Sequence, residues 1–281
     1  MTPVADSSML YTSRPWPVVR NAIVTLLQQH REHTVYGSAE VDFTLAQQRI
    51  SEYRRKTGMA VSPHAFLIHC LALAASEHPE VVTYRRGKNL ITFSHIDVGT
   101  VIEKLVRGTG RIPVGYIFRS AENQSMACCN MELRQACKSS LEADALVQQR
   151  RKMAAYPGIV RSIQAHRIKK DPLLLRRYHG VIGLTNLQVQ GLNRPFFAFP
   201  TQIYTLTLSA GSLIERLSMG SGGMAVSRKF LCMAAGANHE VIDGMAMAKF
   251  ARRFTELVET AHGLDERFIQ ETICLRRERE L

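Results

Sequence analysis

The segment from Pro63 to about His78 reads PHAFLIHCLALAASEH and is apolar on almost every face of a helix. Ser62 and Pro63 give it a strong start, because serine caps helix N-termini and proline fits the first helical turn. A helix that is apolar all round has to be buried. The longest nearly unbroken apolar stretch, residues 65–75, is far shorter than the roughly 20 residues that cross a bilayer. The sequence therefore predicts a globular core around this helix and excludes a membrane-spanning protein.

Helical and strand patterns alternate along the rest of the chain without the regular repeat of a parallel α/β protein. Further helices are expected near residues 19–27, 44–58, 133–145 and 244–261. Strands are expected at residues 36–43, 90–93, 96–102, 113–118, 181–185, 202–208 and 229–235. The glycine-rich run 219–224 lacks the GKS or GKT ending of a phosphate loop and is predicted to be a hairpin turn. The pattern indicates one α+β domain over residues 1–281, with a mixed sheet covered by helices.

The charge of the chain is concentrated in one segment. Lysine and arginine number 36 against 24 acidic residues, a net charge of +12. Nine basic residues and one acidic residue lie between Arg150 and His179, so this segment supplies +8 of the total. It could be a solvated connector, or a surface that binds an acidic partner or phosphates, and the sequence leaves both open. Pro157, Gly158 and Pro172 argue against one long helix across it.

The cysteines and the N-terminus point to a protein of the reducing cytoplasm. The six cysteines form no CxxC pair and no regular spacing, so neither a zinc ribbon nor a disulfide framework is indicated. The N-terminal residues show no basic region followed by an apolar one, as a secretory signal would. We therefore expect a cytoplasmic chain with reduced thiols and no metal site.

His239 is the one histidine of the ten with a candidate functional setting. It precedes Asp243 by four residues and Gly244 by five, where a predicted strand gives way to a helix. Such a junction can present an imidazole at the end of a strand while the carboxylate braces the local backbone. Taken alone, these residues leave two alternatives open, a catalytic histidine or a chance histidine beside an Asp243 that caps the helix.

The segment HEVIDGMAMAKFARRFTELVE, residues 239–259, resembles the HxxxDG motif and following helix in the catalytic domain of dihydrolipoyl acyltransferases. The same motif occurs in chloramphenicol acetyltransferases and in condensation domains of peptide synthetases. Other segments resemble the family in the same order, namely Arg20–Ile23 with AEVDFT (39–44), residues 62–79, HIDVGTVIEK with RIPVGYIFRSAENQSM (95–126), and VIGLTNL (181–187). The resemblance implies the chloramphenicol-acetyltransferase-like α/β sandwich, a mixed sheet covered by helices.

The resemblance also implies a reaction, in which an acyl group moves from a thioester to a thiol, hydroxyl or amine. His239 would be the general base, and Thr185 would donate to the oxyanion in place of the family's serine. Asp243 would hold the loop through an arginine, for which Arg20 is the candidate. The donor would be coenzyme A or a phosphopantetheine thioester, and no metal is implied. The active sites would form between the subunits of a homotrimer.

This chain departs from the family in ways that affect its partners. Asn238 stands where the family usually has aspartate, and no lipoyl or subunit-binding segment precedes the domain, which predicts a stand-alone module. In the large cores of the family, an apolar C-terminal anchor joins the trimers. The charged tail at residues 276–280 would not insert as such an anchor, so an isolated trimer is predicted. Three basic residues are candidates for binding coenzyme A or an acidic acyl-carrier or lipoyl-type domain, namely Arg167, Lys169 and Lys170. The alternative is a catalytically silent trimeric scaffold, while nucleic-acid binding is disfavoured because no recognition motif accompanies the charge.

Overall fold

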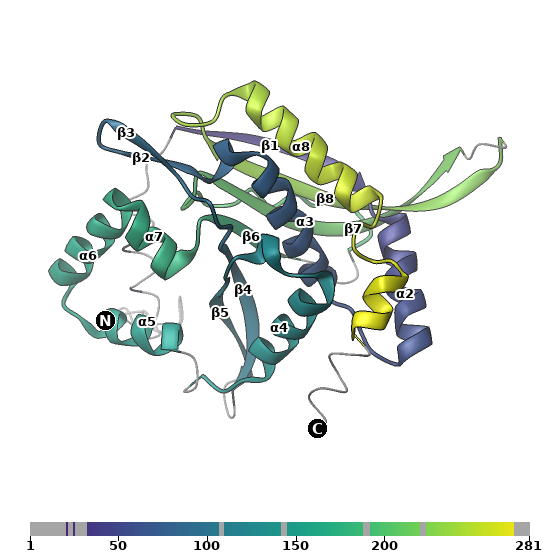
Figure 1. Ribbon diagram of the computed structural model, residues 1–281, viewed down its shortest axis with the longest axis horizontal. Coiled ribbons are helices and arrows are strands. Elements are labelled where there is room, and N and C mark those ends of the chain that lie inside the picture. Colours follow the sequence, from purple (N-terminus) through teal and green to yellow (C-terminus); the bar gives the residue numbers. More distant parts are fainter. Residues whose placement is uncertain are drawn as a thin grey trace, which may run out of the picture.

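A six-stranded mixed sheet carries helices on one face and is the frame of the molecule (Figure 1). The computed structural model of the chain describes residues 21, 25, 33–106, 110–141, 145–187, 192–219 and 223–272. The strands are β1 (Thr34–Asp42), β2 (Thr83–Arg86), β3 (Asn89–Thr92), β4 (Val98–Val106), β5 (Gly110–Phe118), β6 (Ile182–Asn186), β7 (Leu206–Met219) and β8 (Ala225–Asn238). The helices are α2 (Thr44–Thr57), α3 (Pro63–Glu77), α4 (Met126–Lys138), α5 (Ala145–Ala155), α6 (Gly158–Lys170), α7 (Pro172–His179) and α8 (Gly244–Glu259).

The strand order of the large sheet is β1-β8-β7-β6-β4-β5. The short strand β6 runs parallel to both of its neighbours, β4 and β7, whereas the other adjacent pairs are antiparallel. Strands β2 and β3 form a separate two-stranded hairpin. The mixed sheet and its helical cover confirm the fold class predicted from the sequence.

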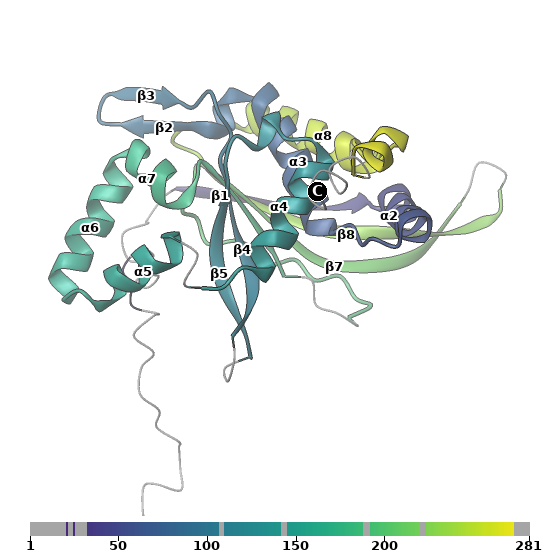
Figure 2. The same cartoon turned by 60° about the horizontal axis from the view of Figure 1, so that its bottom comes forward.

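The two faces of the sheet have different surroundings. On one face lie α3 and α8, and α3 is buried along nearly its whole length, as its apolar sequence requires (Figures 1 and 2). Leu184, Leu208 and Leu231 point into this core from three strands. Side chains alternate along a strand, so the neighbouring Thr185 and Ser209 point to the opposite face. Part of this second face is covered by the loop before β7, because the hydroxyl of Ser209 donates to the carbonyl of Ala198 there.

The basic segment forms three short helices, α5, α6 and α7, with Pro157 before α6 and Pro172 at the start of α7. The prediction that no single long helix spans it is confirmed. Some of its charge is used internally. Arg150 and Arg161 donate to backbone carbonyl oxygens 2.9 and 2.8 Å away, and Arg176 donates to the carboxylate of Asp97 at 2.8 Å. These three arginines thus hold the helices in place.

Strands β7 and β8 continue beyond the rest of the sheet as a projecting hairpin (Figures 1 and 2). The glycine-rich run joins these antiparallel strands, as the predicted hairpin turn requires, with residues 220–222 outside the described part. Leu217, Met219 and Met224 are 71–77% exposed there. A two-stranded ribbon with large exposed apolar side chains gains stability when another surface covers it.

Some predicted elements differ from the structure. The expected helix near 133–145 is divided, because α4 ends at Lys138 and α5 begins at Ala145. Strand β2 was not predicted from the sequence. Of the helix expected near 19–27, the described residues 21 and 25 are helical. Within the described ranges, no helix combines the length and the apolar character that crossing a bilayer requires.

Candidate active site

The turn after β8 places His239 on the surface. Asn238 organises this turn, because its Oδ1 accepts a hydrogen bond from the backbone N–H of Glu240 at 2.9 Å, as in an Asx turn. The backbone N–H of His239 donates to the carbonyl of His33 at 2.8 Å. The imidazole of His239 is exposed and makes no hydrogen bond to any described residue. It is therefore accessible to a bound molecule.

Asp243 caps the helix that follows. Its carboxylate accepts from the backbone N–H of Ala246 at 2.8 Å, at the N-terminus of α8. Aspartate is a preferred N-cap because it satisfies an otherwise unpaired N–H group. The helix-capping role that the sequence allowed for Asp243 is thus present, while the role of His239 is not decided by it. The predicted partner Arg20 lies outside the described residues, so that pairing stays a prediction.

Sequence reasoning missed a small charged cluster beside His239. Glu240 lies 3.1 Å from Nδ1 of His33 and 3.6 Å from Nη1 of Arg85. His33 and Glu240 are 207 residues apart in the chain, so no local pattern could reveal the contact. The cluster ties the β2–β3 hairpin to the His239 turn. The described ranges hold no group of three His, Cys, Asp or Glu side chains that could bind a metal.

Thr185 lies on β6, on the face of the sheet away from α3, and is half-buried. Its hydroxyl makes no hydrogen bond to the described residues. Next to it, Gly183 leaves room for the ring of Tyr204, which a Cβ at position 183 would strike. The Tyr204 hydroxyl donates to the carbonyl of His179 at 2.9 Å, and burial raises the pKa of Tyr204 to about 12. The neutral Tyr204 ring therefore packs against Gly183, two residues before Thr185.

The structure does not bring His239 and Thr185 together within one chain. Thr185 pairs with Ser209 of β7, and Ser209 pairs with Ala234 of β8, five residues before His239. With ~3.3 Å per residue along a strand and ~4.8 Å between strands, the two positions lie about 20 Å apart. Their side chains cannot meet across that distance. A site that uses both residues needs a second copy of the chain.

The predicted donor-binding residues lie at the C-terminal end of α6. Arg167 and Lys170 are exposed, and Lys169 is half-buried. The next residue, Asp171, lies 3.7 Å from Arg86, whose neighbour Arg85 pairs with Glu240. These successive contacts connect the end of the basic helix to the His239 turn.

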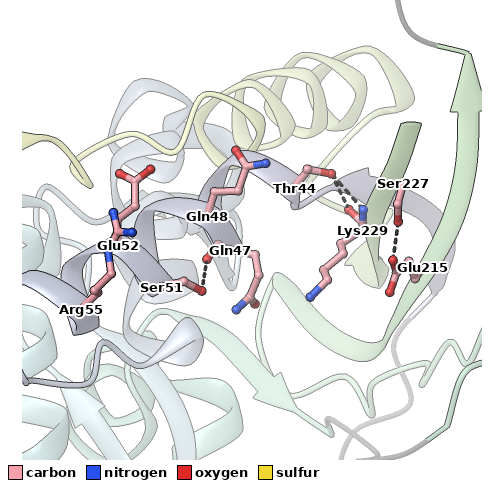
Figure 3. A pocket seen from close by; sticks show the side chains of 9 residues that line it. All are labelled: Thr44, Gln47, Gln48, Ser51, Glu52, Arg55, Glu215, Ser227 and Lys229. Carbon is pink, nitrogen blue, oxygen red and sulfur yellow. Dashed lines mark hydrogen bonds between the residues drawn. The ribbon is translucent and has the colours of Figure 1, made fainter. Parts of the chain in front are cut away.

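A surface groove lies elsewhere on the molecule (Figure 3). It is an open groove of about 520 Å³ between α2 and the β7–β8 ribbon. Gln47, Arg55, Glu215 and Lys229 are among its lining side chains. Lys229 is ten residues before His239 on β8, which corresponds to about 33 Å of strand. The groove is therefore remote from the His239 turn.

No protein-family model and no curated protein sequence matches the chain. Solved structures do match. A probable dihydrolipoamide acetyltransferase from Listeria monocytogenes superposes with a TM-score of 0.64 and 16% identity, over 89% of this chain and 95% of that one. The cubic core of a pyruvate dehydrogenase multienzyme complex gives 0.62 and 16%, over 94% and 98%. The dihydrolipoamide acetyltransferase of Azotobacter vinelandii gives 0.60 and 15%, also over 94% and 98%.

These superpositions define the class of fold. The chain has the fold of dihydrolipoamide acetyltransferase catalytic cores, and it spans almost the whole length of each matched chain. The fold implied by the sequence resemblance is confirmed.

Proposed function

We propose that residues 1–281 form one catalytic domain, an acyltransferase that moves an acyl group from a thioester donor to a thiol, hydroxyl or amine. One observation carries the proposal. In an acetyltransferase-type fold, the exposed His239 imidazole follows a strand end, and the half-buried Thr185 hydroxyl has no partner among the described residues. An available base and an available oxyanion donor are the two groups that acyl transfer needs.

In the proposed mechanism His239 takes the proton from the acceptor as the acceptor attacks the thioester carbonyl. The hydroxyl of Thr185 donates a hydrogen bond to the tetrahedral oxyanion. When the intermediate collapses, the carbon–sulfur bond breaks and the leaving thiolate takes the proton from the His239 imidazolium. General base catalysis contributes typically ~10² to 10⁴ in rate, and one oxyanion donor contributes on the order of 10² to 10³.

The Azotobacter vinelandii enzyme supports the choice of residues. The catalytic roles examined in that protein are those of a serine, a histidine and an asparagine four residues after the histidine. In this chain Thr185 also carries a hydroxyl, and Asp243 likewise lies four residues after His239. A threonine offers the same donor as a serine, although its methyl group narrows the site.

We further propose that the active site forms between copies in a homotrimer. The separation of about 20 Å between His239 and Thr185 supports this arrangement, since each site would take one residue from each of two copies. The exposed apolar side chains of the β7–β8 hairpin support an assembly that covers them. Three chains of 31.6 kDa would have a mass of about 95 kDa.

The proposed donor is coenzyme A or a phosphopantetheine thioester on an acidic acyl-carrier or lipoyl-type domain. Arg167 and Lys170 support an anionic donor, because both are exposed and neither forms an ion pair with a described residue. Lys169 is half-buried in the same turn of α6. A silent trimeric scaffold is the second candidate function. The observation in its favour is that the described groove is remote from His239.

Mass spectrometry of acyl donors tests the proposal. The pure protein is incubated with a panel of acyl-CoA species and acylated carrier proteins, together with thiol, hydroxyl and amine acceptors. We expect acylated acceptor to form, and His239→Ala to slow its formation by roughly 10² or more. His95→Ala is the matched control, because His95 is 55% exposed and pairs with Glu122 away from this turn. Transfer by His239→Ala within a few-fold of wild type would remove His239 from the mechanism, whereas no transfer by the wild type would leave the scaffold as the better explanation.

A further inference from the structure

The outward side of α6 carries an apolar half and a basic half in one line. Ile159, Ile163, Arg167 and Lys170 follow each other at spacings of three or four residues and are all exposed, which places them on one side of the helix. We call these four residues the α6 stripe. Ile159 is 77% exposed and Ile163 is 56% exposed. The opposite side of α6, with Ala165 and Ile168, is buried against the protein.

More residues of the same kinds surround the stripe. Val160 and Tyr156 are 39% and 44% exposed. Arg151 and Lys152, at the end of α5, are exposed and form no ion pair with a described residue. By contrast, the arginines that hold the three helices together are already engaged. The structure thus separates cations with a structural role from cations that are available to a partner.

The α6 helix lies at the outside of the molecule, at the end opposite the β7–β8 hairpin (Figures 1 and 2). An exposed row of branched apolar residues flanked by unpaired cations is typical of the core and rim of a protein interface. Side chains four residues apart on a helix form a ridge that fits between the ridges of another helix.

We propose that the α6 stripe is a docking surface for an acidic protein that contributes an amphipathic helix. Its apolar side chains would pack against Ile159 and Ile163, and its carboxylates would meet Arg167 and Lys170. Opposite charges at the rim would steer the two proteins together and fix their register, while the apolar pair supplies the buried contact.

Other ligands fit the surface less well. The phosphates of a free coenzyme A would need the cations but would leave Ile159 and Ile163 exposed. A helix that lies in a membrane surface has a long apolar face with aromatic or leucine anchors. The apolar part of the stripe is confined to the first half of α6, and the inner side of the helix is occupied by the protein. A protein partner accounts for both halves of the stripe.

The position of the stripe connects it to the proposed chemistry. Its basic end leads into Asp171, which contacts Arg86, next to the Arg85 that pairs with Glu240. A protein docked here would lie on the side of the molecule that holds the His239 turn. The choice of an acyl carrier as its probe rests on the proposed acyl transfer, whereas the docking itself can be measured without any reaction.

The direct test is binding of fluorescently labelled acyl carrier protein, a small acidic helical protein, to the full chain, measured by anisotropy. We expect Ile159→Ser with Ile163→Ser, and separately Arg167→Gln with Lys170→Gln, each to weaken binding at least tenfold. Added salt should weaken binding to the wild type more than to the charge variant. The matched controls are Leu105→Ser, since Leu105 is 78% exposed on β4, and Arg54→Gln with Lys56→Gln on α2. Circular dichroism checks that every variant is folded.

Two parallel measurements separate this inference from the proposed function. Labelled lipoyl domain and vesicles of phosphatidylcholine with 30% phosphatidylserine are tested in the same way, and acyl transfer from free acetyl-CoA is measured for each variant. Binding of acyl carrier protein that depends on the stripe supports docking even if no transfer occurs, and then only the proposed function fails. If the wild type transfers acyl groups from acetyl-CoA but does not bind acyl carrier protein, the docking inference alone is overturned. Stripe-dependent binding of vesicles or lipoyl domain in its place also overturns the inference.

Discussion

Nε2 of His64 on α3 lies 2.8 Å from the hydroxyl of Thr100 on β4. The same hydroxyl donates to the carbonyl of Leu184, 2.7 Å away, so Nε2 of His64 must carry the proton and act as the donor. Nδ1 of His64 is buried without a partner among the described residues. The pair therefore holds a neutral imidazole and connects the central helix to β6, one residue before Thr185.

The first prediction concerns stability in mild acid. Burial lowers the pKa of His64 to about 4, and burial together with the nearby His262 lowers the pKa of His69 to about 4. In the unfolded chain both would titrate near 6.5, so the unfolded state binds protons first as the pH falls. Stability should decrease between pH 6.5 and 4, by on the order of 3 kcal/mol for each fully buried histidine. Urea unfolding at a series of pH values measures this.

A glutamine variant isolates the contribution of His64. His64→Gln can still donate to Thr100 but cannot titrate, so its stability should fall less than that of the wild type between pH 6.5 and 4. Carboxylates change the stability at lower pH than these histidines do. Burial alone would raise the pKa of Asp97, but hydrogen bonds from Arg176 and Arg119 lower it overall, so its contribution is lost only below its usual 3.8. Identical pH profiles for wild type and His64→Gln would contradict the assignment.

The second prediction concerns the hydroxyl of Thr185. Thr185→Val removes the donor while keeping the branched shape, so kcat for acyl transfer should fall by on the order of 10² to 10³ with little change in KM. Thr185→Ser keeps the hydroxyl and should stay within a few-fold of wild type. Steady-state kinetics of the two variants decide the point. Equal activities of the valine and serine variants would remove Thr185 from the mechanism.

Local patterns made part of this structure predictable. The helix α3 could be placed because its cap, its proline and its apolar residues all lie within one short segment. The turn that presents His239 could be placed because the strand, the glycine and the amphipathic α8 are consecutive. The neighbouring cluster could not be foreseen, since Glu240 meets His33 and Arg85 only after distant parts of the chain have folded.

Other features were hidden because charge or tertiary contacts outweigh local pattern. Strand β2 ends in two exposed arginines and has no apolar alternation of its own. Residues 158–170 look like a charged connector, yet they form α6, which packs against α7. The position of β6 between β4 and β7 sets the distance between Thr185 and His239, and strand order is not encoded in any one segment.

The third prediction concerns Asp243. Asp243→Ala removes the cap of α8 and should lower the free energy of unfolding by about 1 kcal/mol. Asp243→Asn keeps a capping oxygen. If capping is the whole role of Asp243, this variant should lower the free energy of unfolding much less. If Asp243 also pairs with Arg20, as the resemblance implies, the asparagine variant should lose stability as well, because a partly buried arginine is left without its carboxylate. Urea unfolding of both variants, and of Arg20→Ala combined with each, separates the two roles.

The fourth prediction concerns the site shared between copies. Light scattering should give about 95 kDa, three times the chain mass of 31.6 kDa. His239→Ala and Thr185→Val should each be nearly inactive alone. In mixed trimers from equimolar co-expression, a site is intact when one copy supplies His239 and its neighbour supplies Thr185, which random assembly with cyclic symmetry gives in about a quarter of sites.

The recovered activity is the measurement, and different affinity tags on the two variants verify that the assayed trimers contain both. Activity of about a quarter of wild type would place the two residues in one site across an interface. Double-tagged trimers without recovered activity would show that His239 and Thr185 do not share a site across an interface. The Thr185→Ser variant mixed with His239→Ala is the control, because it should reach activity without needing complementation. A protein that scatters light as a monomer would exclude the shared site directly, since the sheet holds Thr185 and His239 too far apart to act within one chain.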